Sequence, residues 1–238
     1  MRIARAPAEL TRTGRLPRQL SPRDLMESNR QRGFSMLELM IVIAIGFTVT
    51  SIAVVTLVPT MTQNDTSTAY DTTLMALRNY QNLSVTNRIR YIVTFTNQVV
   101  PGYCNPACGV ITVQQWNYAV PVSPAPFVIN TIYLPHDVSF QTQAGFPTGA
   151  ANVPDGFGAG IVAIDFDQGE GLGSQTYVMF MPDGSSQDVL GNWNSGVLYL
   201  GQTNNLYSSR ALTVFGPTGR IRGWRLYLQG GANTWVQQ

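Results

Sequence analysis

The hydrophobic pattern begins with one long uncharged run, from Leu39 to Val58, that holds 20 residues. As an α-helix at about 1.5 Å per residue, such a run spans roughly 30 Å, the thickness of a bilayer's hydrocarbon core. Residues 61–88 are more polar, but large apolar side chains recur there at helical spacing. These are Tyr70, Leu74, Leu77 and Tyr80. We therefore expect one helix over 34–88, embedded in a membrane over about 34–58, with an apolar face on its second half.

From about Ile89 onward the apolar residues alternate with a period of two, which favours strands. Eight segments have this pattern: IRYIVTF, GVITVQQW, FVINTIYL, GIVAIDF, TYVMFM, GVLYL, ALTVF and IRGWRLYL. Nineteen of the 22 glycines and ten of the 14 prolines lie after residue 100, which is typical of a turn-rich β domain. The sequence thus predicts the α+β class, with a long N-terminal helix packed on a β-rich head over residues 89–238.

Charge is distributed unevenly along the chain. Residues 1–33 hold eight arginines against three acids, whereas the remaining residues hold seven arginines against ten acids. The basic bias lies before the apolar run, so the positive-inside rule places the N-terminus in the cytoplasm and the head on the opposite side of the membrane.

Glu38 is the only charged residue between Arg32 and Asp65. A secretory signal peptide fits poorly, because the run is long, begins beside a glutamate and lacks a small-x-small cleavage site. A plain membrane anchor leaves Glu38 unexplained, since a carboxylate inside a bilayer costs about 2.5 kcal/mol or more.

Gly33 followed by Phe34, with Glu38 at the fifth position after the glycine and an apolar run behind it, resembles a class III prepilin signal. That signal is shared by type IV pilins and type II secretion pseudopilins. The resemblance implies cleavage between Gly33 and Phe34 by a prepilin peptidase and N-methylation of the new Phe34 amine. It also implies that Glu38 pairs with the amine of a neighbouring subunit during assembly, because a buried charge is tolerated when it is paired. Residues 1–33 would be the leader, and a start at Met26 would give a leader of ordinary length.

A second resemblance lies near the C-terminus. TYVMFMPDGSS and RALTVFGPTGRIRGWRL are similar to the end of GspH/FimT-type minor pilins, in which Thr-Gly-Arg-x-Arg follows a hydrophobic strand. The resemblance implies a minor pilin or pseudopilin of a type IV pilus or a type II secretion pseudopilus. Before assembly it would be single-pass in the bacterial inner membrane, in contact with lipid, with a periplasmic head. Its partners would be the peptidase, other subunits and the inner-membrane assembly platform. A major filament subunit is a further alternative.

The C-terminal arginines are a candidate DNA-binding surface. Arg220 and Arg222 are two residues apart, so on a strand they share a face with Trp224, and Arg225 is adjacent. Guanidinium groups beside an aromatic ring suit phosphate contact and base stacking. In FimT-like pilins such a segment is associated with DNA uptake. The alternative is a solvated hairpin end, which the net acidic mature chain favours.

Two further groups of residues are candidate sites in the head. Cys104 and Cys108 are expected to form a disulfide in an oxidising compartment, with free or differently paired thiols as the alternative. A weak calcium candidate consists of Asp165, Asp167 and Glu170, but the segment lacks the D-x-D-x-D-G pattern, so a solvated turn is the simpler interpretation.

The chain has one histidine and no G-x-S-x-G motif, so we expect neither an enzyme nor a cofactor.

Overall fold

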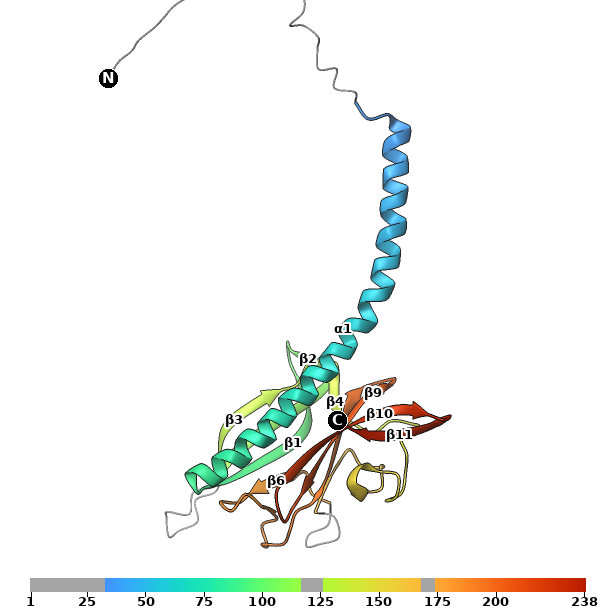
Figure 1. The fold of residues 1–238 in the computed structure, drawn as a ribbon. Coiled ribbons are helices and arrows are strands. Elements are labelled where there is room, and N and C mark those ends of the chain that lie inside the picture. The colour runs from blue at the N-terminus through green and yellow to red at the C-terminus, as the bar shows by residue number, and fades with distance from the viewer. Residues whose placement is uncertain (1–32, 117–125, 168–173) are drawn as a thin grey trace, which may run out of the picture. The chain divides into compact units, whose positions relative to one another are not determined.

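The computed structural model describes residues 33–116, 126–167 and 174–238, and for 53–63 it describes the backbone alone. The leader predicted over 1–33, with Met26, and the candidate ligand Glu170 lie outside the described residues, apart from Gly33. The chain forms two compact units, Met1–Ser51 and Ile52–Gln238. Figure 1 shows the helix and the β-rich head.

The helix α1 covers Met36–Asn87, within two residues of the range predicted at each end. It begins directly after Ser35, whose Oγ accepts a hydrogen bond from the backbone N–H of Leu37 at 3.3 Å. A serine at this position satisfies one of the free N–H groups of the first turn. Among the residues that the structure describes, no helix is long and apolar enough to cross a membrane. The membrane-embedded segment predicted over about 34–58 is therefore not confirmed.

The head contains two antiparallel sheets. The first has the strand order β3-β2-β1-β6-β7. Its strands are β1 (Arg90–Val100), β2 (Cys104–Trp116), β3 (Phe127–Tyr133), β6 (Tyr177–Phe180) and β7 (Ser186–Gln187). The second half of α1, which belongs to the same unit as the sheet, lies across this sheet in Figure 1.

The second sheet has the order β11-β10-β9-β8-β4, and the short β5 also pairs with β8. Its strands are β4 (Val138–Phe140), β5 (Ile164–Phe166), β8 (Gly196–Gln202), β9 (Asn205–Phe215), β10 (Arg220–Gln229) and β11 (Ala232–Gln237). A 3₁₀ turn, η2 (Pro154–Gly156), precedes β5. Every residue of β8 is buried, which explains why its sequence GVLYL is almost continuously apolar.

Each of the eight segments predicted as strands overlaps a strand of the structure. The strands β4, β7 and β11 were not predicted. β4 and β7 have three and two residues, too few to show a period. β11 is the return strand of a hairpin whose turn is Gly230-Gly231, both with positive φ (58° and 84°). That Gly-Gly pair is a sequence signal for a tight hairpin.

The main core lies between α1 and the two sheets. Tyr70, Leu77 and Tyr80 of α1 are buried in it, which confirms the apolar face predicted for the second half of the helix. Leu198 and Leu212 of the second sheet belong to the same cluster.

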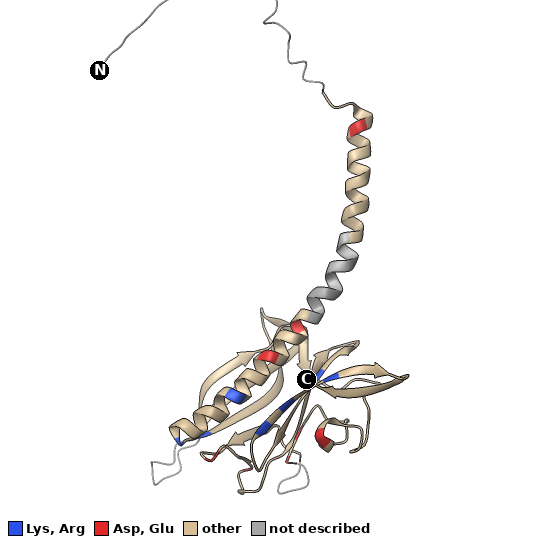
Figure 2. Ribbon diagram, in the orientation of Figure 1, with Lys and Arg blue, Asp and Glu red and all other residues tan. Residues whose placement is uncertain are grey.

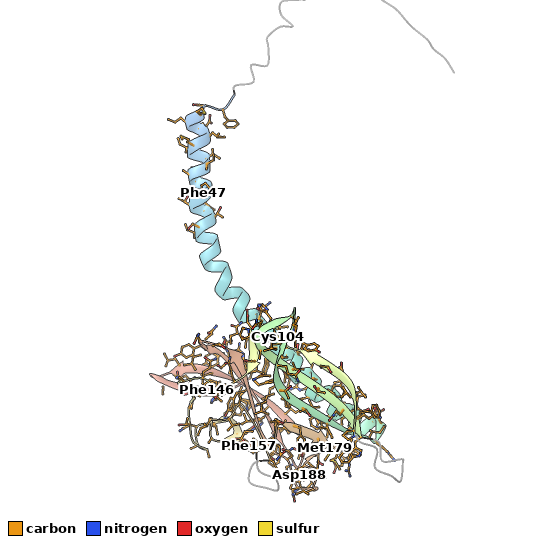
Figure 3. The ribbon with its side chains drawn as sticks, turned by 180° about the vertical axis from the view of Figure 1, so that it is seen from behind. Phe47, Cys104, Phe146, Phe157, Met179 and Asp188 are labelled. Carbon is orange, nitrogen blue, oxygen red and sulfur yellow. A yellow bond between two sulfur atoms is a disulfide. The ribbon has the colours of Figure 1, made fainter. Side chains whose placement is uncertain are left out.

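A second, smaller cluster covers the other face of the second sheet. Phe146, Tyr199 and Trp235 meet there, with ring centroids 5.2–5.4 Å apart. Figure 3 shows Phe146 in this part of the head. The second sheet is therefore apolar on both faces, and Phe146 and Phe157, from the segment before β5, pack on its outer side.

Candidate functional site

The first turn of α1 and the residues directly before it carry the predicted processing and assembly motif. Gly33 precedes the helix, Phe34 is 76% exposed, and Glu38 is exposed at the third position of the helix. Ser35 and Glu38 thus have the spacing of a capping box, S-x-x-E, and a carboxylate in the first turn interacts favourably with the helix dipole. This local role of Glu38 was not expected from the sequence, although the spacing signalled it.

The helix of the first unit is apolar around its whole circumference. Large apolar side chains are exposed at 12 of the 19 positions of residues 34–52, and Phe47 projects from the helix in Figure 3. A helix that is hydrophobic on all sides is stable only when other apolar surface surrounds it. An exposed apolar surface of this extent indicates an interaction surface.

In the head, the Thr-Gly-Arg-x-Arg turn is attached to α1. The side-chain amide of Gln81 donates hydrogen bonds to the carbonyls of Gly184 and Gly219, each at 3.0 Å. Gly219 has φ +61°, and a Cβ there would overlap the Gly184 carbonyl and the Gln81 amide. The glycine of the turn therefore serves the close approach of helix and turn.

Arg222 is paired within the head. Its Nη1 lies 2.6 Å from Oδ1 of Asp155, which comes from the 3₁₀ turn η2. The other oxygen of Asp155 accepts a hydrogen bond from the Thr213 hydroxyl at 2.5 Å, and the indole N–H of Trp224 donates to that hydroxyl at 3.2 Å. Arg222 and Trp224 thus share a face, as predicted, but a carboxylate neutralises the arginine. Nothing in the sequence spacing links Asp155 to Arg222.

The other two arginines of β10 lie in different surroundings. Arg220 is exposed at the strand's start, with its Cζ 5.5 Å from the ring centroid of Phe215. The side chain of Arg225 lies on the opposite face of β10, where its register partner is Arg210 of β9. The structure brings Arg220, Arg222 and Trp224 to one face and separates Arg225 from them, so DNA binding by this strand stays a prediction.

The disulfide predicted between Cys104 and Cys108 is present, with a Cα–Cα distance of 5.9 Å. It joins the first and the fifth residue of β2, and Cys104 is labelled in Figure 3. The peptide bond before Pro106, inside this loop, is cis.

Asp165 and Asp167 of the calcium candidate lie at the end of β5. Asp165 and Asp167 are buried, and the backbone N–H of Asp167 donates to Oδ1 of Asn194 at 2.7 Å. Within residues 33–116, 126–167 and 174–238, no group of three potential metal ligands is found. Calcium binding with Glu170 is untested.

Residues 28–54 match a family model described as the prokaryotic N-terminal methylation motif. No curated protein and no solved structure matches the chain. The matched range contains Gly33, Phe34 and Glu38, and it supports a type IV pilin-like prepilin. The GspH/FimT subtype is not confirmed. The motif therefore indicates a type IV pilin-like or pseudopilin subunit that is processed by a prepilin peptidase and assembles with other pilin subunits.

Proposed function

We propose that this protein is a structural subunit, a minor pilin or pseudopilin of GspH/FimT type, of a type IV pilus or a type II secretion pseudopilus. The observation that carries the proposal is the methylation motif at the start of an all-round apolar helix that is followed by a β-rich head. The role is mechanical assembly rather than catalysis.

The proposed sequence of events begins in the bacterial inner membrane. The apolar helix holds the precursor there in contact with lipid, with the N-terminus cytoplasmic and the head periplasmic. The peptidase cuts between Gly33 and Phe34, and the Phe34 amine is methylated. At the assembly platform the helix exchanges lipid for the helices of other subunits, and Glu38 of one subunit pairs with the Phe34 amine of the next, which compensates both buried charges.

Cleavage at Gly33 is tested by replacing it with leucine. A Cβ added at Gly33 would have no neighbouring heavy atom within 4 Å, so the substitution disturbs no packing in the folded chain. We expect an uncut precursor in the membrane fraction, because the peptidase requires the small residue. Mass spectrometry of the wild-type protein should find a methylated Phe34 at its N-terminus.

Gly46→Leu is the matched control. Gly46 also has no atom within 4 Å of a built Cβ, but it lies 13 residues further along the chain. This variant should be cut normally. A mature N-terminus at any residue other than Phe34, or normal cutting of the Gly33 variant, would contradict the proposed processing.

DNA uptake through Arg220 and Arg222 is the alternative function, and we rank it second. Arg222 is neutralised by Asp155, and Arg220 contacts Phe215, so both side chains have a structural role. A shift assay with DNA and the full chain at 50 mM salt separates the two functions: DNA binding that weakens in the Arg220→Gln/Arg222→Gln variant would favour DNA uptake.

A major filament subunit, the third possible function, would be abundant in sheared surface fractions.

A further inference from the structure

Two arginines face each other across the second sheet. Arg210 of β9 and Arg225 of β10 are direct register partners, so their side chains emerge on the same face. That face is directed toward α1, because Nη2 of Arg210 lies 3.4 Å from Oγ of Ser67. Like charges directly opposite on neighbouring strands destabilise a sheet. The pair therefore opposes folding unless something compensates its charge.

The partners of both side chains are neutral. Nη1 of Arg210 donates to the carbonyls of Ser208 and Ser209, at 2.9 and 3.3 Å. Arg225 stacks over the ring of Tyr227, with Cζ 5.1 Å from the centroid, and its buried Nε has no hydrogen-bond partner among the described residues. Charged donors prefer charged acceptors, since such hydrogen bonds are about twice as strong as neutral ones.

Acidic residues compensate the pair only weakly. In the part of the chain that the structure describes, no carboxylate oxygen lies within 4.0 Å of either guanidinium. Burial lowers the pKa of Arg210 to about 10, and the charge of Arg225 acts in the same direction. Asp71, exposed on α1, has the smallest of the opposing effects on that pKa.

Access to the pair is through Arg225. Arg210 is only 5% exposed, whereas Arg225 is partly exposed and Tyr227 beside it is 38% exposed. Arg225 is therefore the member of the pair nearer to solvent, and the charge of Arg210 lies beside it on the adjacent strand.

We propose that Arg210 and Arg225 form a binding site for a phosphate group, either free phosphate or the phosphate of a lipid headgroup. A tetrahedral oxyanion presents several acceptor oxygens to the planar forks of arginine side chains, a geometry that guanidinium groups match well. The negative charge of the oxyanion would compensate the repulsion between the two guanidinium groups. This site is independent of the proposed filament function and lies on the opposite face of β10 from Arg222.

The test measures thermal unfolding of the full chain in a maltoside detergent, which carries no phosphate. Sodium phosphate is titrated at constant ionic strength, with chloride as the replaced anion. Ligand linkage predicts a rise in Tm that grows with the logarithm of the phosphate concentration and reaches about 3–6 °C at tenfold excess over Kd for a domain of this size. Soluble glycerophosphoglycerol, a headgroup without acyl chains, replaces phosphate in a parallel titration. A rise at lower concentration with this compound would identify a lipid headgroup as the source.

Arg225→Gln should lose the rise, and its Tm in chloride should equal or exceed that of the wild type, because the like-charge pair is gone. If Arg225 only stabilises the fold, the Arg225→Gln variant should instead have a lower Tm in chloride than the wild type. Arg222→Gln, on the same strand but paired with Asp155, is the matched control and should keep the rise. The proposal is overturned if neither anion shifts the wild-type Tm beyond chloride, or if Arg225→Gln responds as the wild type does.

Discussion

Gly223 lies in the middle of β10, a position where glycine usually weakens a strand. A Cβ at this position would overlap the hydroxyl and ring of Tyr70 on α1, so the absence of a side chain allows the helix to approach the sheet. One residue thus sets the distance between two elements that are more than 100 residues apart in sequence.

Gly223→Ala should lower the free energy of unfolding by about 1–3 kcal/mol, the usual cost of overpacking a core. Urea unfolding followed by tryptophan fluorescence measures the change. In the Tyr70→Ala background the same substitution should cost clearly less, because the overlapping ring is absent. An equal cost in both backgrounds would show that the contact is not the cause.

Tyr199 is fully buried in the second cluster, and its hydroxyl has no hydrogen-bond partner among the described residues. Burial raises the pKa of Tyr199 well above its usual value, and the charge of Asp165 acts in the same direction. Both observations mean that the hydroxyl group reduces the stability that the ring provides.

Tyr199→Phe should therefore raise the free energy of unfolding by about 1–3 kcal/mol at pH 8, because it removes an unpaired buried polar group. In the unfolded chain tyrosine ionises near pH 10. The unfolded wild type then loses its proton before the folded form does, so wild-type stability falls as pH rises above about 10. The advantage of the variant should widen between pH 8 and pH 10.5.

Tyr207→Phe is the control for this experiment. Tyr207 is 46% exposed, so its substitution should change stability by less than about 0.5 kcal/mol. A constant difference between wild type and the Tyr199 variant across this pH range would contradict the expectation.

At the scale of elements, the second half of α1 is part of the head's core. Leu77 is fully buried between the sheets, whereas Met75, two residues before it, is 70% exposed. The helix therefore contributes packing on one face only, as its apolar spacing indicated.

Leu77→Ala should lower the free energy of unfolding by about 2–5 kcal/mol, the range for a buried leucine that leaves a cavity. Met75→Ala tests the same helix at an exposed position and should change stability by less than about 0.5 kcal/mol. Chemical denaturation of the full chain in detergent measures both. Comparable losses in the two variants would mean that helix propensity, rather than core packing, determines the effect.

At the scale of the whole molecule, charged residues are few, 12% of the chain. Figure 2 shows β2 and β3 without charged residues and a single acid in the first turn of α1. That acid, Glu38, has two roles to distinguish, since its spacing from Ser35 is that of a capping box and it is proposed to pair with the Phe34 amine of a neighbouring subunit.

Glu38→Gln separates these roles, because glutamine keeps the capping-box geometry but loses the charge. We expect a folded, membrane-inserted protein whose incorporation into filaments is strongly reduced. Immunoblots of sheared filament fractions measure incorporation. Ser35→Ala, which weakens the helix start but keeps the carboxylate, should assemble almost normally. Wild-type incorporation of the glutamine variant would remove the pairing argument.

The sequence by itself determined the N-terminal motif, the long helix with its one apolar face, eight strands and the short-range disulfide. All of these depend on neighbours within a few residues, through periodicity, turn residues and spacing.

Only the tertiary structure decided which residues from distant segments meet. Asp155 reaches Arg222 across 67 residues, and Arg210 lies opposite Arg225 because of the β9–β10 register. The strand pattern showed that Arg222 and Arg225 are close along the chain but did not show that one is neutralised and the other is not. Pairing of this kind depends on sheet register and on loops that pack over a sheet, and a shift of one residue would move every side chain to the other face.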